Sequence, residues 1–109
     1  MNYISPRNAA PASGLGAAIA AGLAPDGGLY VPAELPRFAP PDFDDCTALP
    51  AIATRLLEPF FAGDALAAEL PAICAEAFDF PAPLVALATP RDFVLELFHG
   101  PTAAFKDFG

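Results

Sequence analysis

Few side chains in this 109-residue sequence have the chemistry of a nucleophile or a base, and two of them stand close together near its end. Lys106 is the only lysine and His99 is the only histidine. The run FVLELF at residues 93–98 predicts a buried strand before them, and Thr102 stands where the N-cap of a following helix is expected. Ligands of α/β proteins bind beyond the carboxyl ends of strands, often against a helix N-terminus, so this segment is the candidate site.

Lys106 is expected in the first turn of that helix, between Phe105 and Phe108. The positive end of the helix and the apolar neighbours both disfavour the charged ammonium form. A lysine that is more readily deprotonated is what imine formation with an aldehyde requires. The alternative is a solvent-exposed lysine in an ordinary first turn, and the residue types alone favour that alternative.

The remaining chemistry-bearing residues indicate no further site, and we expect no metal. Cys46 and Cys74 have neither metal-ligand spacing nor a C-x-x-C pattern, which favours free, half-buried thiols of a cytosolic protein over a disulfide. Residues 107–109 spell DFG, the magnesium-binding triplet of protein kinases, but the other kinase motifs are missing upstream. A net charge of −8 argues against a nucleic acid or an anionic membrane surface as partner.

The amino-terminal part holds an apolar run at residues 14–24 that has about the length of a signal-peptide core. It is too short to cross a bilayer, which needs about 20 residues. Only Arg7 precedes it, and the turn at residues 25–28 follows directly, so we interpret it as a helix over about residues 13–23, closed by Gly22, in a cytoplasmic protein.

Two further helices are expected in the middle of the chain. The first has Thr47 as its N-cap and Pro50 in its first turn, and Pro59 and Gly63 mark its end. Its apolar face, at spacings of three and four residues, consists of Leu49, Ile52, Leu56 and Phe60. The second follows Asp64 and restarts at Pro71. Its apolar face consists of Leu70, Ile73, Ala77 and Phe78.

Short strands are expected near Tyr3, near Tyr30 and at residues 93–98, separated by a proline-rich surface connection at residues 32–41. Another short apolar run, at residues 84–88, is followed by a turn at residues 89–92. We therefore expect an α+β fold in which these strands form one small sheet and two or three helices pack on it.

Several segments resemble one known family. Residues 99–109, HGPTAAFKDFG, are similar to the lysine motif of the threonine synthase family, pyridoxal-phosphate enzymes of the tryptophan-synthase-β fold type. Residues 2–5 (NYIS), 22–32 (GLAPDGGLYVP) and 77–81 (AFDFP) resemble the family in the same order. Two departures stand out: Ala103 replaces a commonly larger residue, which would loosen packing behind the lysine, and residues 13–21 are alanine-rich.

The resemblance implies a function. Threonine synthases convert O-phospho-L-homoserine and water to L-threonine and phosphate. By this resemblance, Lys106 would bind pyridoxal 5'-phosphate as an imine and then transfer protons, while the cofactor acts as the electron sink for the elimination and rehydration. His99 and Thr102 lie within the motif and are expected to line the site without a definite role.

The resemblance also suggests an organisation. We expect residues 1–90 to be the amino-terminal domain of this family and residues 91–109 to be the first strand and lysine loop of the cofactor domain. The cofactor needs a phosphate cradle and a partner for its ring nitrogen, and the glycine clusters at residues 14–16 and 26–28 follow no strand as a phosphate loop does.

The sequence therefore predicts the amino-terminal piece of a longer enzyme, inactive alone. The alternative is a non-catalytic folded module that self-associates through exposed apolar surface or an edge strand.

Overall fold

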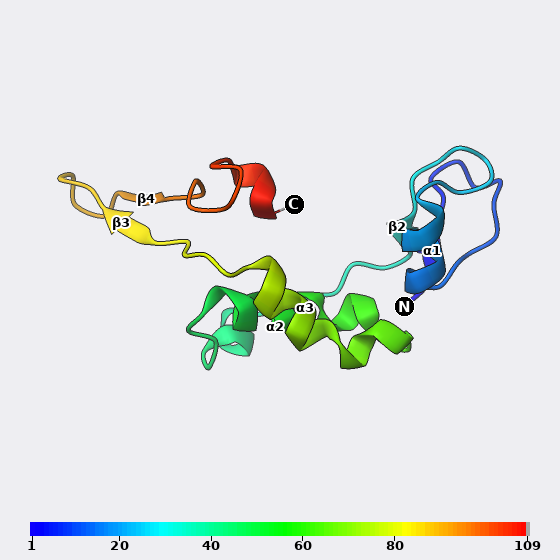
Figure 1. Ribbon diagram of the computed structural model, residues 1–109, viewed down its shortest axis with the longest axis horizontal. Helices are drawn as coiled ribbons and strands as arrows, with labels where there is room; N and C mark the ends of the chain where they lie inside the picture. Colours follow the sequence, from blue (N-terminus) through cyan, green and yellow to red (C-terminus); the bar gives the residue numbers. More distant parts are fainter. Residues whose placement is uncertain (109) are drawn as a thin grey trace.

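Fourteen prolines divide the chain into short elements. In the computed structural model, which describes residues 1–108, these elements form an elongated molecule with extents of 52 × 26 × 26 Å. Figure 1 shows α1 and β2 at one end, α2 and α3 in the middle, and the hairpin of β3 and β4 at the other end, while the C-terminal turn, in red, lies back toward the middle.

The amino-terminal part is built on two short strands and one helix. β1 (Tyr3–Ile4) pairs antiparallel with β2 (Val31–Pro32), and α1 (Leu15–Ala21) lies between them in sequence. Gly22 ends α1 at a φ of 71°, a conformation that side chains with a Cβ rarely adopt. Tyr3, Leu15 and Ala18 form a small core, which confirms the predicted helix and its closing glycine.

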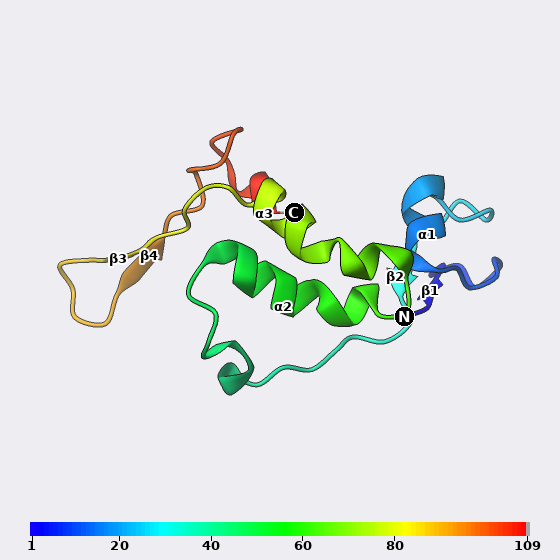
Figure 2. The same ribbon diagram turned by 60° about the horizontal axis from the view of Figure 1, so that its bottom comes forward.

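The middle part is an antiparallel pair of helices, α2 (Leu49–Phe61) and α3 (Leu70–Ala77), which lie side by side in Figures 1 and 2. As predicted, Pro50 and Pro71 lie in the first turns, where a missing N–H is harmless. A 3₁₀ turn at Ala65–Ala68 joins the two helices. Ala53, Leu70 and Cys74 form the second core.

The predicted capping and apolar face of α2 are wrong. The N-cap is Ala48, without a side-chain bond, because Thr47 in that position would face Pro50 at N3, which has no N–H. Ala53 lies on the face of α2 toward α3, and Leu57 and Phe61 pack against this core. Since alanine is small, it lets the two helices approach closely. Ile52 and Leu56 of the predicted face are 38% and 44% exposed.

The predicted face of α3 is wrong at two positions, Ile73 and Ala77, both of which are exposed. Ile73 is 41% exposed, and Cys74, one residue further along, is 1% exposed and contributes to the core instead. Both cysteines are free thiols, as their spacing predicted, but the expected half-burial holds only for Cys46, since Cys74 is 1% exposed.

The carboxyl-terminal part begins with a hairpin. β3 (Leu84–Ala86) pairs antiparallel with β4 (Phe93–Leu95), with Val85 opposite Val94. The α+β fold class is confirmed, but the strands form two separate two-stranded sheets where one was expected. β4 follows β3 after a short loop. Closing a short loop costs less chain entropy than pairing either strand with β1, which is distant in the sequence.

The burial of the predicted strand at residues 93–98 is also wrong. It is regular only over Phe93–Leu95, and these residues are 41–56% exposed because no helix of the described chain covers them. Within residues 1–108, none of the helices has the length and apolar character needed to cross a bilayer.

Candidate functional site

Lys106 lies in a single 3₁₀ turn, Phe105–Phe108. The sequence predicted a helix capped by Thr102, but Ala103 and Ala104 separate Thr102 from this turn. Ala103 has a φ of 53°, in the left-handed region, and its N–H donates to the carbonyl oxygen of Gly100 at 3.0 Å. The segment from Gly100 to Phe108 is therefore a tight loop, which we call the lysine loop.

Two hydrogen bonds close this loop. The Thr102 hydroxyl donates to Oδ1 of Asp107 at 2.6 Å, and the Thr102 backbone N–H donates to Oδ2 of the same carboxylate at 3.1 Å. We call this pair of bonds the Thr102–Asp107 clasp. It stabilises the ionised carboxylate, and the bond from the Thr102 hydroxyl is the largest cause that lowers the pKa of Asp107.

Gly100 makes room for the clasp. A Cβ at this position would lie 2.7 Å from the Cβ of Asp107, closer than real Cβ contacts come. The φ of Gly100 is not in the left-handed region, so the close approach of Asp107 is what requires glycine here.

The amine of Lys106 is open to solvent. Lys106 is an exposed residue, and within residues 1–108 it forms no ion pair. Both oxygens of neighbouring Asp107 are instead engaged by Thr102. An exposed lysine in a short turn is the alternative that the residue types alone favoured, and its amine is accessible to an aldehyde.

His99 does not join this arrangement. Its Nε2 lies 2.7 Å from Oε2 of Glu96, and its ring packs against Phe98 with 4.6 Å between centroids. In the described part of the chain no hydrogen bond links it to Lys106 or Thr102. The structure thus brings Thr102 and Lys106 into one loop and leaves His99 on the segment before it.

An apolar groove of about 840 Å³ lies beside the lysine loop. Phe108 lines it and packs edge-on against Phe80, with 5.3 Å between ring centroids, and near Phe78 at 6.4 Å. Ile52, from the face of α2 that the sequence predicted as core, lines the other side. The aromatic contacts of Phe108 therefore hold the end of the lysine loop against the end of α3.

Sequence reasoning missed Asp107 and Gly100 as parts of the site. Asp107 was considered only within the DFG triplet, although it follows the only lysine and lies five residues after a hydroxyl. Short carboxylate–hydroxyl spacing of this kind is the available signal, since such side chains commonly bond the backbone of their own loop.

Comparisons with known proteins agree on one family. Residues 2–78 match the family model for the threonine synthase N terminus. The threonine synthase of Pseudomonas aeruginosa is 46% identical over 115 residues, which cover 99% of this chain and 24% of that protein.

Two solved structures resemble the fold. A PLP-bound threonine synthase from Brucella melitensis has a TM-score of 0.82 at 41% identity, over 98% of this chain and 24% of that chain. The threonine synthase of Escherichia coli has a TM-score of 0.83 at 31% identity, over 99% and 26%. The chain thus spans about a quarter of the length of the relatives it matches.

Proposed function

The chain belongs to the threonine synthase family, and from this we propose that it is the part of a threonine synthase that carries the cofactor lysine, Lys106. The observation that supports this most directly is the exposed Lys106, which forms no ion pair within residues 1–108 and lies in a motif loop. The likeness to the PLP-bound Brucella melitensis enzyme extends over 98% of the chain, well beyond the 2–78 match. We assign the gene product to the cytoplasm and to the conversion of O-phospho-L-homoserine and water to L-threonine and phosphate.

The residues present fit one part of pyridoxal 5'-phosphate, its aldehyde. The glycine N–H groups that would suit a phosphate are engaged elsewhere: Gly16 donates to Asp64 at 2.9 Å, and Gly28 donates to Asp26 at 3.0 Å. Those carboxylates also repel an anion. Lys106 supplies the amine, and the phosphate cradle is a task for residues outside 1–108.

Lys106 has two tasks in this proposal. Its Nζ holds the cofactor, and once released it accepts and returns protons at the substrate carbons. The cofactor, when bound, supplies an electron sink for the carbanions of the reaction. An exposed Nζ on a closed loop suits both tasks, because it is reachable and its backbone is fixed.

We keep the division into residues 1–90, the amino-terminal domain, and residues 91–109, the first strand and lysine loop of the cofactor domain. The boundary falls in the turn between β3 and β4, so this hairpin connects the two parts. His99 and Thr102 remain candidates for the rim of the site.

The test traps the amine that carries the cofactor. The gene product is incubated with pyridoxal phosphate and borohydride, digested, and the modified peptide is identified by mass spectrometry. We expect the label on Lys106, with phosphate release from O-phosphohomoserine lost in Lys106→Ala and in Lys106→Arg, which keeps the charge.

Within residues 1–108 the other amine is that of Met1, whose ammonium group donates to the carbonyl oxygen of Ala62 at 2.6 Å. A label that stays unchanged in Lys106→Ala, or that maps to Met1 alone, contradicts the proposal.

A further inference from the structure

We propose that Thr102 and Asp107 are positioning residues: their clasp fixes the loop that presents Lys106 and keeps the lysine amine free of its neighbouring carboxylate. This inference rests on the proposed function of Lys106. It gives Thr102 a task different from lining the site, because its hydroxyl already donates to Oδ1 of Asp107 at 2.6 Å.

The first support is that one residue engages both oxygens of the carboxylate. The Thr102 hydroxyl takes Oδ1 and the Thr102 N–H takes Oδ2 at 3.1 Å, so the carboxylate cannot rotate without losing a bond. Bonds to an ionised acceptor are about twice as strong as neutral ones. Lys106 lies on the segment that these bonds close.

The second support concerns the charge next to Lys106. A free aspartate beside a lysine attracts its ammonium group and would draw it away from a ligand. Here both carboxylate oxygens are directed at Thr102, and within residues 1–108 Lys106 forms no ion pair. The bond from the Thr102 hydroxyl is the largest cause that lowers the pKa of Asp107, and the charge of Lys106 contributes least.

The third support is that the loop is held at a second point. Phe108 packs against Phe80 with 5.3 Å between centroids, directly after the clasp residue Asp107. The turn with Lys106 is thus fixed by the clasp before it and by the aromatic contact after it. Loss of the clasp would leave it free to move on one side.

Gly100 offers a way to break the clasp without removing any of its groups. In Gly100→Ala the new Cβ would lie 2.7 Å from the Asp107 Cβ and 2.8 Å from its Cγ, so the carboxylate must move. No left-handed φ is involved, so the substitution adds no backbone strain of its own. Gly16→Ala is the matched control, since its Cβ would meet only ordinary contacts at 3.5 Å.

The experiment compares Thr102→Val, Thr102→Ser and Gly100→Ala in the gene product with pyridoxal phosphate bound. The circular dichroism of the bound cofactor reports whether it is held in one orientation, and kcat is measured beside it. We expect Thr102→Val and Gly100→Ala to lower both by about tenfold or more, because small misplacements of a reacting group are costly. Thr102→Ser keeps the hydroxyl and should remain within about twofold of the unchanged protein, as should Gly16→Ala.

The outcomes separate this inference from the proposed function. Wild-type dichroism and kcat in both Thr102→Val and Gly100→Ala, with loss only in Lys106→Ala, overturn the clasp and leave the function of Lys106 standing. A borohydride label that stays unchanged in Lys106→Ala overturns the proposed function instead, and the positioning role with it. If Thr102→Val lowers the helical signal of α2 and α3, Gly100→Ala and Thr102→Ser decide the question.

Discussion

Asp26 and Asp107 both accept hydrogen bonds from a hydroxyl and from the backbone, but their donors lie at different distances along the sequence. Each carboxylate accepts one hydroxyl and at least one backbone N–H: Asp26 from Ser5 at 2.7 Å, Ala9 and Gly28, and Asp107 from Thr102. The donors to Asp26 lie up to 21 residues away, and Ser5 is 1% exposed. Thr102 lies five residues from Asp107 and is exposed.

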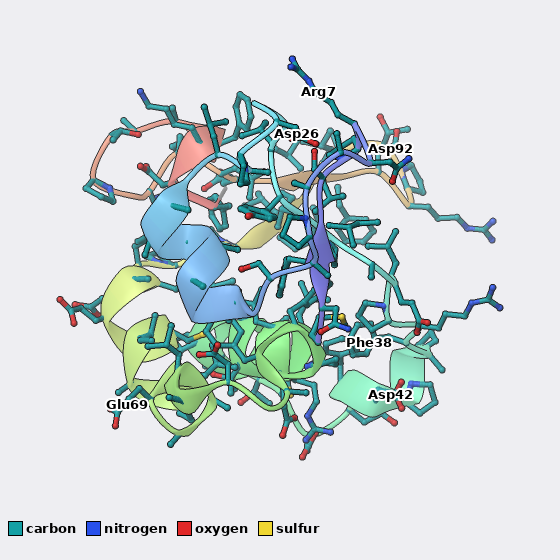
Figure 3. The ribbon with its side chains drawn as sticks, turned by 90° about the vertical axis from the view of Figure 1, so that its right-hand side faces the viewer. Arg7, Asp26, Phe38, Asp42, Glu69 and Asp92 are labelled. Atoms are coloured by element: carbon teal, nitrogen blue, oxygen red, sulfur yellow. The ribbon has the colours of Figure 1, made fainter. Side chains whose placement is uncertain are left out.

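The same contrast holds for the regions around them. At the amino-terminal end, where Figure 3 shows Arg7 extending outward and Asp26 below it, side-chain bonds join residues that are far apart in the sequence. The Tyr3 hydroxyl donates to the Phe60 carbonyl at 2.7 Å, and Asp64 accepts the Gly16 N–H at 2.9 Å, so α1 is tied to the end of α2. Among residues 79–108, none is buried.

Residues 1–78 therefore have a core of their own, and residues 79–108, which carry the chemistry, are ordered mainly by local contacts. We call residues 1–78, which have a buried core, the self-sufficient part, and residues 79–108, none of which is buried, the dependent part. Each prediction below changes one part and tests whether the other responds.

The largest effect concerns activity. The 109-residue chain alone should release no phosphate from O-phosphohomoserine above the level of its Lys106→Ala variant, with pyridoxal phosphate present. An amine without a phosphate cradle leaves the cofactor unoriented, and orientation accounts for about 7–11 kcal/mol of a barrier. Phosphate release is followed by a colorimetric assay. Turnover that depends on Lys106 in this short chain would show that the dependent part is complete.

The next effect concerns stability. Leu70→Ala should lower the free energy of unfolding by about 2–5 kcal/mol, because Leu70 is 2% exposed in the core between α2 and α3. Leu95→Ala removes the same atoms from β4, where the side chain is 53% exposed, and should cost about 0.5 kcal/mol or less. Urea unfolding followed by helical circular dichroism measures both. Equal losses would mean that the hairpin belongs to the core.

A smaller effect concerns association. The chain should self-associate as its concentration rises, because Leu84, Phe93 and Leu95 place exposed apolar side chains on a hairpin with open edges. Leu84→Lys should raise the dissociation constant by about tenfold or more, measured by sedimentation. Ile19→Lys on α1, where the side chain is 61% exposed, is the control and should leave it unchanged. A monomer at all concentrations contradicts the expectation.

The sequence predicted the elements better than it predicted their burial. Gly22 at the end of α1 and the prolines in the first turns of α2 and α3 act through backbone geometry, which is local and therefore visible in the sequence. The core face of α2 was wrong because spacing alone does not distinguish Ile52 from Ala53 when both are apolar. The packing of α3 decides between them.

The candidate site shows the same limit. Lys106 was identified from its motif and its uniqueness, both of which are properties of the sequence. The clasp depends on Ala103 adopting a φ of 53° and on Gly100 admitting Asp107, and neither follows from residue type. The position of His99 outside the lysine loop, with its Nε2 2.7 Å from Oε2 of Glu96, also depends on the local path of the backbone.

The smallest effect is the pH dependence of stability, and it separates two aspartates. Hydrogen bonds from Gly16 and Leu66 lower the pKa of Asp64 below its ordinary value of 3.8, and Thr102 does the same for Asp107. A carboxyl whose pKa is lower in the folded state stabilises the fold above pH 3.8, and this contribution is lost as the pH falls below it. At neutral pH Asp64 thus favours the bonds between α1 and the residues after α2, whereas Asp107 favours only the closed lysine loop.

Of Asp64 and Asp107, only Asp64 accepts bonds within the self-sufficient part, from Gly16 and Leu66, so of these two variants only Asp64→Asn should change global unfolding. We expect this variant to be less stable at neutral pH and to lose less stability on acidification, because one of the carboxylates that must be protonated is gone. Asp107→Asn should leave the unfolding of α2 and α3 unchanged at every pH, since no residue beyond position 78 is buried within the described chain. Urea titrations at neutral pH and below pH 3.8 measure both variants. An Asp107→Asn variant whose helices unfold more easily would show that the lysine loop supports the core, and that the two regions are energetically one.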